Sequence, residues 1–257
     1  MLSSRSLAVA ATATRLLLAD PAPIVTTIVT PLLLTAFLIP ATRAQLRMSG
    51  LAHATGGEQL VPGTAVMFSF FGLSLVVSLF YREHAWGTWD RLRASSASSL
   101  DIVVGKIAPL YACMLAQMVV LFVAGSALFG YAANGSITAL ALVIAVFVGM
   151  LCAFGVMLFA VFSTMDQAMI IGNLGGMLMA GIGGALTPTS DLPGWAQAIA
   201  HGTPAYWALR AIRDVTFRHA GLGDVLGSTA VLCGFAVGFA CVAALRFRAS
   251  DAKVGTT

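Results

Sequence analysis

Charged residues are scarce in this chain. Only 9% of its 257 residues are Asp, Glu, Lys or Arg, whereas 59% are hydrophobic, and the mean hydropathy is +0.92. A soluble domain of this length needs many more polar side chains to cover its core. Unbroken apolar runs of about 20 residues also exclude a β-barrel, whose strands are shorter and alternate in hydrophobicity. The composition therefore predicts an all-α membrane protein that crosses the bilayer several times.

Patterns that indicate catalysis or metal binding are also missing. The four cysteines lie inside apolar runs without metal-ligand spacing, so we interpret them as small buried hydrophobes. The four histidines are scattered, and no Ser/His/Asp or paired-carboxylate arrangement falls within an apolar run. Gly105-Lys106 is not a phosphate-binding loop, because leucine and not glycine stands at position 100. We therefore expect no catalytic residue, no metal site and no cofactor in this chain.

Six apolar segments are long enough to cross a membrane as helices. They lie at about 24–40, 62–81, 107–133, 137–163, 168–186 and 225–245. The first is the weakest, because it is short and contains Pro31, although neighbouring helices can satisfy the carbonyl that a proline frees. Residues 21–257 are predicted to form a single six-helix transmembrane domain.

Residues 1–20 combine apolar and basic side chains at helical spacing. This pattern predicts an amphipathic helix that lies in the membrane interface. The alternative is a secretory signal peptide, which is disfavoured because Arg15 interrupts its apolar core and Asp20-Pro21 makes a poor cleavage site.

The distribution of basic residues predicts the orientation. If both termini are cytoplasmic, the inside segments hold nine Lys and Arg residues and the outside segments hold five. This difference favours a protein with both ends in the cytoplasm. The net charge of +4 is explained by this topology, and we find no nucleic-acid signature.

The 38 residues between Leu186 and Val225 are rich in Pro, Trp and Tyr and carry apolar residues at helical spacing. We expect one or two short helices here, re-entrant or interfacial, before the sixth span. Their candidate residues at an outer gate or interface are Trp195, Tyr206, Trp207, Arg210 and Arg213. The aromatic rings would lie at headgroup depth, and the arginines would pair with Asp214 or with lipid phosphate.

The segment from Arg82 to Lys106 holds seven charged residues between two apolar runs, so it must lie in water. Its pattern is Arg82-Glu83, Gly87-Thr88, Arg91-Leu92-Arg93 and then Gly105-Lys106. The order of these pairs resembles the first cytoplasmic loop of ABC type-2 transporter permeases of the daunorubicin-resistance kind. That family often has leucine and proline at places where this chain has Trp89 and Ser96 or Ala97.

Other features of the family recur along nearly the whole chain. They are the N-terminal amphipathic helix, Asp20-Pro21 before the first span, Pro31 within it, and an outer segment with Pro188, Leu192-Pro193, Trp195 and Pro204. The resemblance implies a membrane subunit that pairs with a second permease, identical or paralogous. Two copies of a cytoplasmic ATPase would bind ATP and Mg, with membrane lipids around the complex and the bacterial plasma membrane as its location.

The resemblance also implies where the ATPase is contacted. A coupling helix from Glu83 to about Ser95 would lie in a groove of the ATPase, with Arg82, Glu83, Gly87, Thr88, Arg91 and Arg93 as candidate coupling residues. The short turn at residues 163–167, with Asp166, would form a second and smaller contact. ATP would drive export by binding one of two states of the complex more tightly than the other.

The fifth apolar segment carries small residues at four-residue spacing: Gly172, Gly176, Ala180 and Gly184. Such a stripe allows helix backbones to touch, either in a close-packed, mobile helix beside the pathway or at the subunit seam, or in plain packing within the chain. Asn173 is a candidate for a substrate contact or, as the alternative, for an interhelical hydrogen bond.

Apart from Lys106 near an end, the apolar runs contain no charged residue, which disfavours an ion-coupled carrier or a channel for hydrophilic solutes. Phe68, Phe71, Met114, Asn173 and Met177 are candidates for the wall of a pathway for apolar cargo, unless they face lipid or core. The prediction is an exporter subunit for a hydrophobic or amphiphilic drug, antibiotic or lipid. The alternatives are a membrane scaffold or assembly factor of the same fold and an intramembrane enzyme acting on lipids.

Overall fold

The computed structural model describes residues 22–48, 50, 54–85 and 99–246, and regular structure in this part of the chain is helical throughout. In chain order the elements are α2 (Ala22–Met48), α3 (Gly57–Ser69), the 3₁₀ turn η1 (Phe70–Gly72), α4 (Leu73–Ala85), α6 (Ser99–Phe129), α7 (Ile137–Val161), α8 (Met165–Ile182), the 3₁₀ turn η2 (Thr189–Asp191), α9 (Gly194–Ala200), α10 (Pro204–Arg218) and α11 (Leu222–Arg246).

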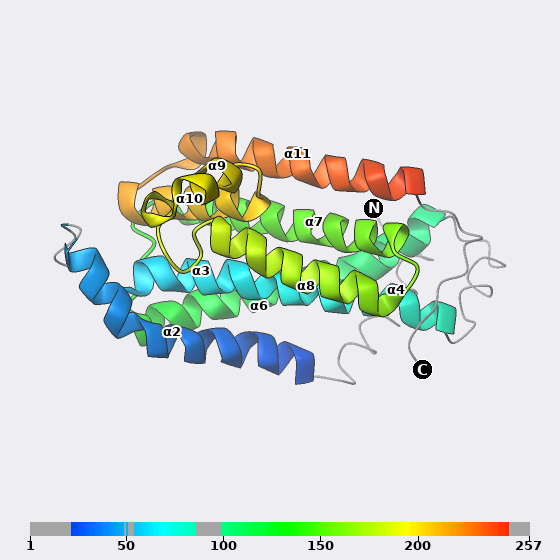
Figure 1. Cartoon of the computed structure of the whole chain (residues 1–257), viewed down its shortest axis with the longest axis horizontal. Helices are drawn as coiled ribbons and strands as arrows, with labels where there is room; N and C mark the ends of the chain where they lie inside the picture. The colour runs from blue at the N-terminus through cyan, green and yellow to red at the C-terminus, as the bar shows by residue number, and fades with distance from the viewer. Residues whose placement is uncertain (1–21, 49, 51–53, 86–98, 247–257) are drawn as a thin grey trace.

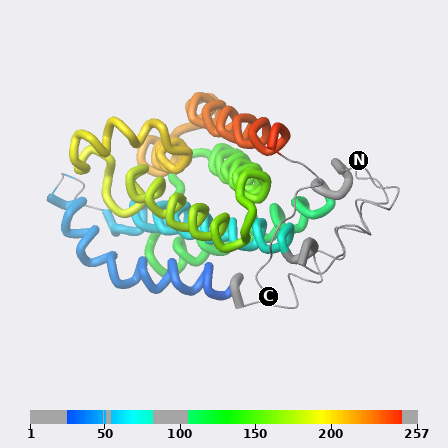
Figure 2. Tube along the Cα trace, turned by 45° about the vertical axis from the view of Figure 1, so that its right-hand side comes forward, coloured from blue at the N-terminus to red at the C-terminus, as the bar shows by residue number. Residues whose placement is uncertain are grey.

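The long helices run side by side along one axis (Figure 1). α3, η1 and α4 follow one another through the middle of the bundle, with α2 and α6 packed against α3 and with α7 packed between α4 and α11. The short helices α9 and α10 gather at one end of the bundle, beside the end of α8, and both views agree on this placement (Figures 1 and 2). The opposite end holds the last turn of α4 and the connection between α7 and α8 (Figure 1).

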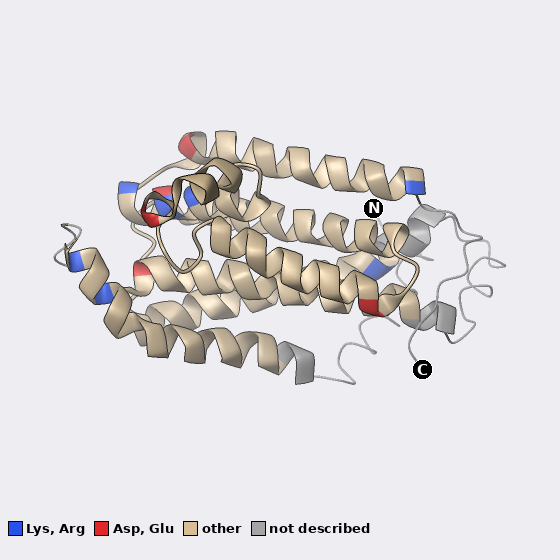
Figure 3. Ribbon diagram, in the orientation of Figure 1, with Lys and Arg blue, Asp and Glu red and all other residues tan. Residues whose placement is uncertain are grey.

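Five helical stretches have the length and composition needed to cross a membrane. They are Val25–Met48, Gly57–Tyr81, Gly105–Phe129, Ile137–Val161 and Leu222–Arg246. Their surfaces carry large apolar side chains that a soluble protein would bury: Phe37 is 80% exposed, Val123 64% and Leu245 82%. Charged residues lie toward the two ends of the bundle and leave its middle almost uncharged (Figure 3). These features define a multi-pass membrane protein.

The sixth predicted segment, 168–186, forms α8, which is not among these five stretches. The helix covers Met165–Ile182, and its first turn contains the polar pair Asp166-Gln167, which lowers its overall apolar character. A sixth crossing therefore stays a prediction. The predicted N-terminal amphipathic helix, residues 1–20, lies outside the described residues.

Several helices begin or end at other residues than the apolar runs predicted. The first helix continues to Met48 instead of 40, and the second begins at Gly57 instead of 62. The early start is possible because the Glu58 carboxylate accepts hydrogen bonds from the amides of Thr55 and Gly56, at 3.1 Å each for one oxygen. The third helix ends at Phe129 instead of 133, since Gly130 adopts a positive φ of 68° that leaves the helix.

Pro31 does not interrupt the first helix. A proline at position 31 removes the amide that would otherwise bond to the carbonyl of Thr27 four residues earlier. The Gln117 side chain of α6 donates to that carbonyl at 3.4 Å. The sequence-based expectation that a neighbouring helix satisfies the freed carbonyl is therefore met by an identifiable residue.

Candidate functional site

The predicted coupling segment begins in the last turn of α4. Arg82 and Glu83 belong to that turn, whereas Gly87, Thr88, Arg91 and Arg93 lie outside the described residues. Asp166, the predicted second contact, is exposed in the first turn of α8. The end of α4 and the connection from α7 to α8 lie at the same end of the bundle (Figure 1).

Three segments that flank the predicted ATPase contacts are joined by direct interactions. The hydroxyl of Tyr81, in α4, donates to the carbonyl of Phe162, in the α7–α8 connection, at 2.7 Å. The fully buried Lys106, near the start of α6, places its Nζ 4.7 Å from the centre of the Phe80 ring. The rings of Phe80 and Tyr81 both pack against Phe159 of α7, with centroids 5.1 and 5.0 Å apart. These contacts therefore join the last turns of α4 to the start of α6, to α7 and to the α7–α8 connection.

The five candidate pathway residues do not share one surface. Phe68 and Phe71 stack with ring centroids 5.5 Å apart, and both belong to the segment that runs from α3 into η1. Met114 of α6 is fully buried against Gly72, while Met177 of α8 is exposed. The structure thus places one pair together in the middle of the bundle and divides the others between core and surface.

Asn173 is engaged with another helix. Its amide donates to the hydroxyl of Ser74, in α4, at 3.0 Å. A polar pair of this kind lets two helices associate inside the bilayer, because each group replaces the water it would otherwise need. This geometry corresponds to the interhelical alternative considered for Asn173.

The small residues of α8 face the interior of the chain. Gly172, Gly176 and Ala180 are buried, with Gly172 against Leu158 and Leu73, and Gly176 against Phe70. Gly184 is a correction to the predicted stripe: α8 ends at Ile182, and Gly184 lies beyond it with a φ of 95°. The four-residue spacing continues in the sequence past the point where the helix has stopped.

We expect Gly176→Ala to destabilise the protein by about 1–3 kcal/mol, the usual cost of overpacking. A Cβ at this position would lie 2.4 Å from the ring of Phe70, which is fully buried. Gly175→Ala is the matched control, since nothing lies within 4 Å of its would-be Cβ and alanine favours the helix. Thermal unfolding of the two full-length variants in detergent measures the difference. An equal or lower stability of Gly175→Ala would contradict the packing assignment.

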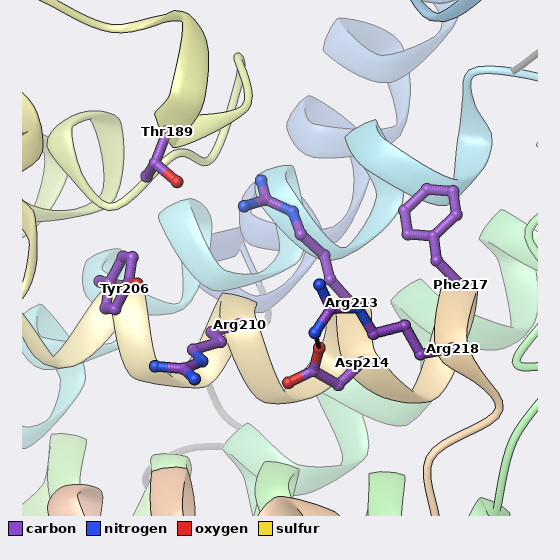
Figure 4. Close-up of a pocket in the computed structure, with 7 residues that line it drawn as sticks. All are labelled: Thr189, Tyr206, Arg210, Arg213, Asp214, Phe217 and Arg218. Atoms are coloured by element: carbon purple, nitrogen blue, oxygen red, sulfur yellow. Dashed lines mark ion pairs between the residues drawn. The ribbon is translucent and has the colours of Figure 1, made fainter. Parts of the chain in front are cut away.

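The opposite end of the bundle contains a cavity, which we name the α10 pocket (Figure 4). Its volume is about 470 Å³, and its lining residues are Thr189, Tyr206, Arg210, Arg213, Asp214, Phe217 and Arg218. All but Thr189 belong to α10. That helix starts at Pro204, a favourable first helical residue, and its capping residue Thr203 accepts a hydrogen bond from the amide of Tyr206 at 3.4 Å.

Positively charged residues outnumber negatively charged ones in the lining of the α10 pocket. Three arginines and one aspartate line it, so its formal charge is two positive. Arg218 pairs with Asp214 at 3.2 Å, as the dashed line in Figure 4 marks. Arg210 is exposed, and its guanidinium lies 5.4 Å from the centre of the Trp207 ring. Two guanidinium groups therefore lack a carboxylate partner within the pocket.

Arg213 joins α10 to two other elements. Its Nη2 donates to the carbonyl of Gly184, which also accepts from the Gln59 side chain of α3 at 3.2 Å. Among the described side chains, the Nε of Arg213 is the buried polar atom that has no hydrogen-bond partner. Burial lowers the pKa of Arg213 to about 10, which leaves the guanidinium positively charged at neutral pH.

The pattern of residues predicted this end of the protein only in part. Arg210 and Arg213 were expected to pair with Asp214 or with lipid phosphate; all three line one pocket, but Asp214 pairs with Arg218. Trp195 lies on α9 and is 63% exposed. Arg218 was missed, although its position four residues after Asp214 is the spacing of a helical ion pair. The role of the Gly184 carbonyl has no signal in the sequence.

A bundle with five helical stretches long and apolar enough to cross a membrane fits the class of membrane transport subunits. The chain matches the model of the ABC-2 family transporter protein over residues 39–245, and it belongs to that family.

Two curated relatives are similar to this chain. The linearmycin resistance permease protein LnrN of Bacillus subtilis strain 168 is 24% identical over 192 residues, which cover 74% of this chain and 48% of the relative. The probable multidrug ABC transporter permease YbhR of Escherichia coli strain K12 is 25% identical over 158 residues, 61% of this chain and 42% of the relative. The chain spans about half the length of the curated relatives it matches, and no solved structure matches it significantly.

Proposed function

We propose that this chain is the membrane subunit of an exporter that moves a hydrophobic or amphiphilic compound, such as a drug, an antibiotic or a lipid, out of the cytoplasm or the inner leaflet. ATP hydrolysis takes place on a separate ATPase subunit. The observation that carries the proposal is the family match over residues 39–245. The printed names of both relatives, a linearmycin resistance permease and a probable multidrug permease, support the class of cargo.

The proposed topology has six crossings with both ends in the cytoplasm. α8 supplies the additional crossing: its 18 residues extend ~27 Å at 1.5 Å per residue, close to the thickness of the hydrocarbon core. The side of α8 that faces away from the bundle carries exposed Ile170, Leu174 and Leu178, which suit contact with lipid. The end with α9 and α10 then faces outward, and these short helices lie at or within the outer membrane surface.

Polar groups inside the bundle support an apolar cargo, because they form hydrogen bonds with one another between helices. The hydroxyls of Thr35, in α2, and Thr64, in α3, lie 2.9 Å apart, and Ser74 pairs with Asn173. Apart from Lys106, the apolar runs of the sequence contain no charge that a hydrophilic solute or a coupled ion would need.

We propose that ATP binding and hydrolysis on the ATPase act on this chain through the segment after α4 and through the α7–α8 connection near Asp166. The Tyr81 to Phe162 hydrogen bond and the contact of Lys106 with the Phe80 ring support a concerted movement of these parts. Two permease chains, identical or paralogous, would rest on two ATPase subunits that bind ATP and Mg. A conformational change follows when ATP prefers one of two arrangements of the complex.

Purification of the tagged full-length chain from its native membranes tests the partnership. We expect an ABC ATPase to co-purify, and we expect amphiphilic compounds to stimulate its ATP hydrolysis in reconstituted membranes. A second permease in the same preparation would show whether the pair is identical or paralogous. Isolation of the chain with a membrane assembly and without any ATPase would favour the scaffold alternative instead.

A further inference from the structure

The α10 pocket has the features of an anion site. Its lining contributes three arginines against one aspartate, and Asp214 is already paired with Arg218 at 3.2 Å. Asp191, next to the pocket in η2, accepts hydrogen bonds from Gln45 and Ser190 at 2.9 Å each, so its carboxylate is also engaged. The guanidinium groups of Arg210 and Arg213 are left to attract a negative charge from outside the chain.

The orientation of Arg213 indicates where in the pocket an anion would bind. Its guanidinium points from α10 toward Thr189 and α3 in Figure 4, and one of its nitrogens holds the Gly184 carbonyl. A buried donor without a partner is costly, and the Nε of Arg213 is such a donor. An acceptor with several oxygens would satisfy it and compensate the buried positive charge at the same time.

The surroundings indicate the chemistry of that acceptor. Tyr206 lines the pocket, and Trp207 contacts Arg210; both are aromatic residues of the kind that gather where lipid headgroups meet the hydrocarbon. Phosphate is the anionic group at that depth of a bilayer, and arginine binds it through paired N–H donors. A cavity of about 470 Å³ is large enough for a phosphate with a small polar substituent.

We infer that the α10 pocket binds an anionic phosphate group, with Arg213 and Arg210 as the binding residues. The ligand is either a lipid headgroup or a free phosphate compound, since both offer the same oxygens. The aspartate of the Asp214–Arg218 pair moderates the positive potential of the pocket. This site depends on the geometry of α10 and η2, and it does not require the chain to export anything.

Native mass spectrometry of the full-length chain in neutral detergent tests the site. The probes are phosphatidylglycerol, which is anionic, and phosphatidylcholine, which is zwitterionic, with inorganic phosphate measured separately by calorimetry. We expect phosphatidylglycerol to bind more tightly than phosphatidylcholine. Arg210→Gln and Arg213→Gln should each weaken its binding about fivefold, the effect of removing one basic residue near anionic lipid.

Two further variants separate an anion site from a general effect on folding. Asp214→Asn should strengthen phosphatidylglycerol binding about fivefold, because it removes the negative charge and releases Arg218. Arg47→Gln is the matched control, since Arg47 is an exposed arginine in the last turn of α2 that does not line the pocket. Its binding should equal that of the unaltered chain.

The outcomes are distinct. Arginine-dependent binding of phosphatidylglycerol alone supports the site and identifies a lipid ligand, whereas arginine-dependent binding of inorganic phosphate supports it with a soluble ligand. If Arg213→Gln does not fold, Arg210→Gln and Asp214→Asn still test the inference, because they are expected to change phosphatidylglycerol binding in opposite directions. Equal binding by these two variants, or an equal loss in Arg47→Gln, would overturn the inference.

Discussion

Replacing Gly63 with alanine is expected to prevent the chain from reaching a stable fold. A Cβ at position 63 would lie 1.7 Å from the backbone oxygen of Ala185, and a backbone carbonyl cannot rotate away as a side chain can. The segment that carries this oxygen is held from both sides, because the carbonyl of Gly184 accepts from Gln59 and from Arg213. We expect a loss of about 3 kcal/mol or more, at the upper end of overpacking costs.

The measurement is the yield and thermal unfolding of the full-length variant in detergent, followed by size-exclusion chromatography. Gly149→Ala is the control within another buried helix: its Cβ would meet the Tyr111 ring at 3.7 Å, an ordinary contact. We expect that variant to fold at least as well as the original chain, since alanine is the better helix former. A Gly63→Ala protein of normal yield and stability would mean that α3 and the segment after α8 are not packed as described.

Charge reversal in the predicted coupling segment is expected to abolish ATP-driven export. Glu83→Lys and Arg91→Glu each place the wrong sign at a surface where the ATPase is proposed to dock, and like charges across an interface oppose binding. Insertion into the membrane should be unchanged, because both positions lie in the charged segment between two apolar runs. Transport of an amphiphilic dye and the amount of chain in the membrane are the two measurements.

Arg47→Glu is the control for this pair, since it reverses an exposed charge in the last turn of α2, at the other end of the bundle from the last turn of α4 (Figure 1). Its export should equal that of the unaltered chain. Restoration of export by a compensating charge reversal on the ATPase would identify the contact directly. Normal export by both Glu83→Lys and Arg91→Glu would remove the assignment of the coupling helix.

The positions of the membrane helices could be predicted because the signal is a simple one. An unbroken apolar run has few stable structures other than a helix in a bilayer, so all five candidate crossings begin or end within a few residues of the predicted bounds. Helix ends were less predictable, since they depend on local features such as the hydrogen bond from the Thr55 amide to the Glu58 carboxylate and the positive φ of Gly130. Apolarity alone contains no information on either.

Contacts between distant segments explain what the sequence did not reveal at the candidate site. The spacing of Arg210 and Arg213 indicates a shared helix face, yet Arg213 donates to the carbonyl of Gly184, which also accepts from Gln59, and both partners belong to other parts of the chain. The packing of the small-residue stripe was likewise not fully predictable from the sequence. Gly176 and Gly184 look equivalent in the sequence, but one lies against Phe70 within α8 and the other lies after the helix has ended.

Tyr81 illustrates a further kind of residue that a pattern cannot identify. In the sequence it is an aromatic residue at the end of an apolar run, a common place for tyrosine in membrane proteins. In the structure its hydroxyl binds the Phe162 carbonyl and so links α4 to the α7–α8 connection. Its partner is 81 residues away, and only the packing of α4 against α7 and α8 brings the two together.

ATP-dependent movement of a fluorescent amphiphile tests the proposed function most directly. The full-length chain, purified with its ATPase and any second permease, would be reconstituted into vesicles that contain the dye on one side. We predict that ATP with Mg causes directional transfer of the dye, and that transfer stops when ATP is omitted or Glu83→Lys is introduced. Hydrolysis of ATP by the complete complex with no transfer of any amphiphilic dye or lipid would contradict the assignment of this chain as the exporting subunit.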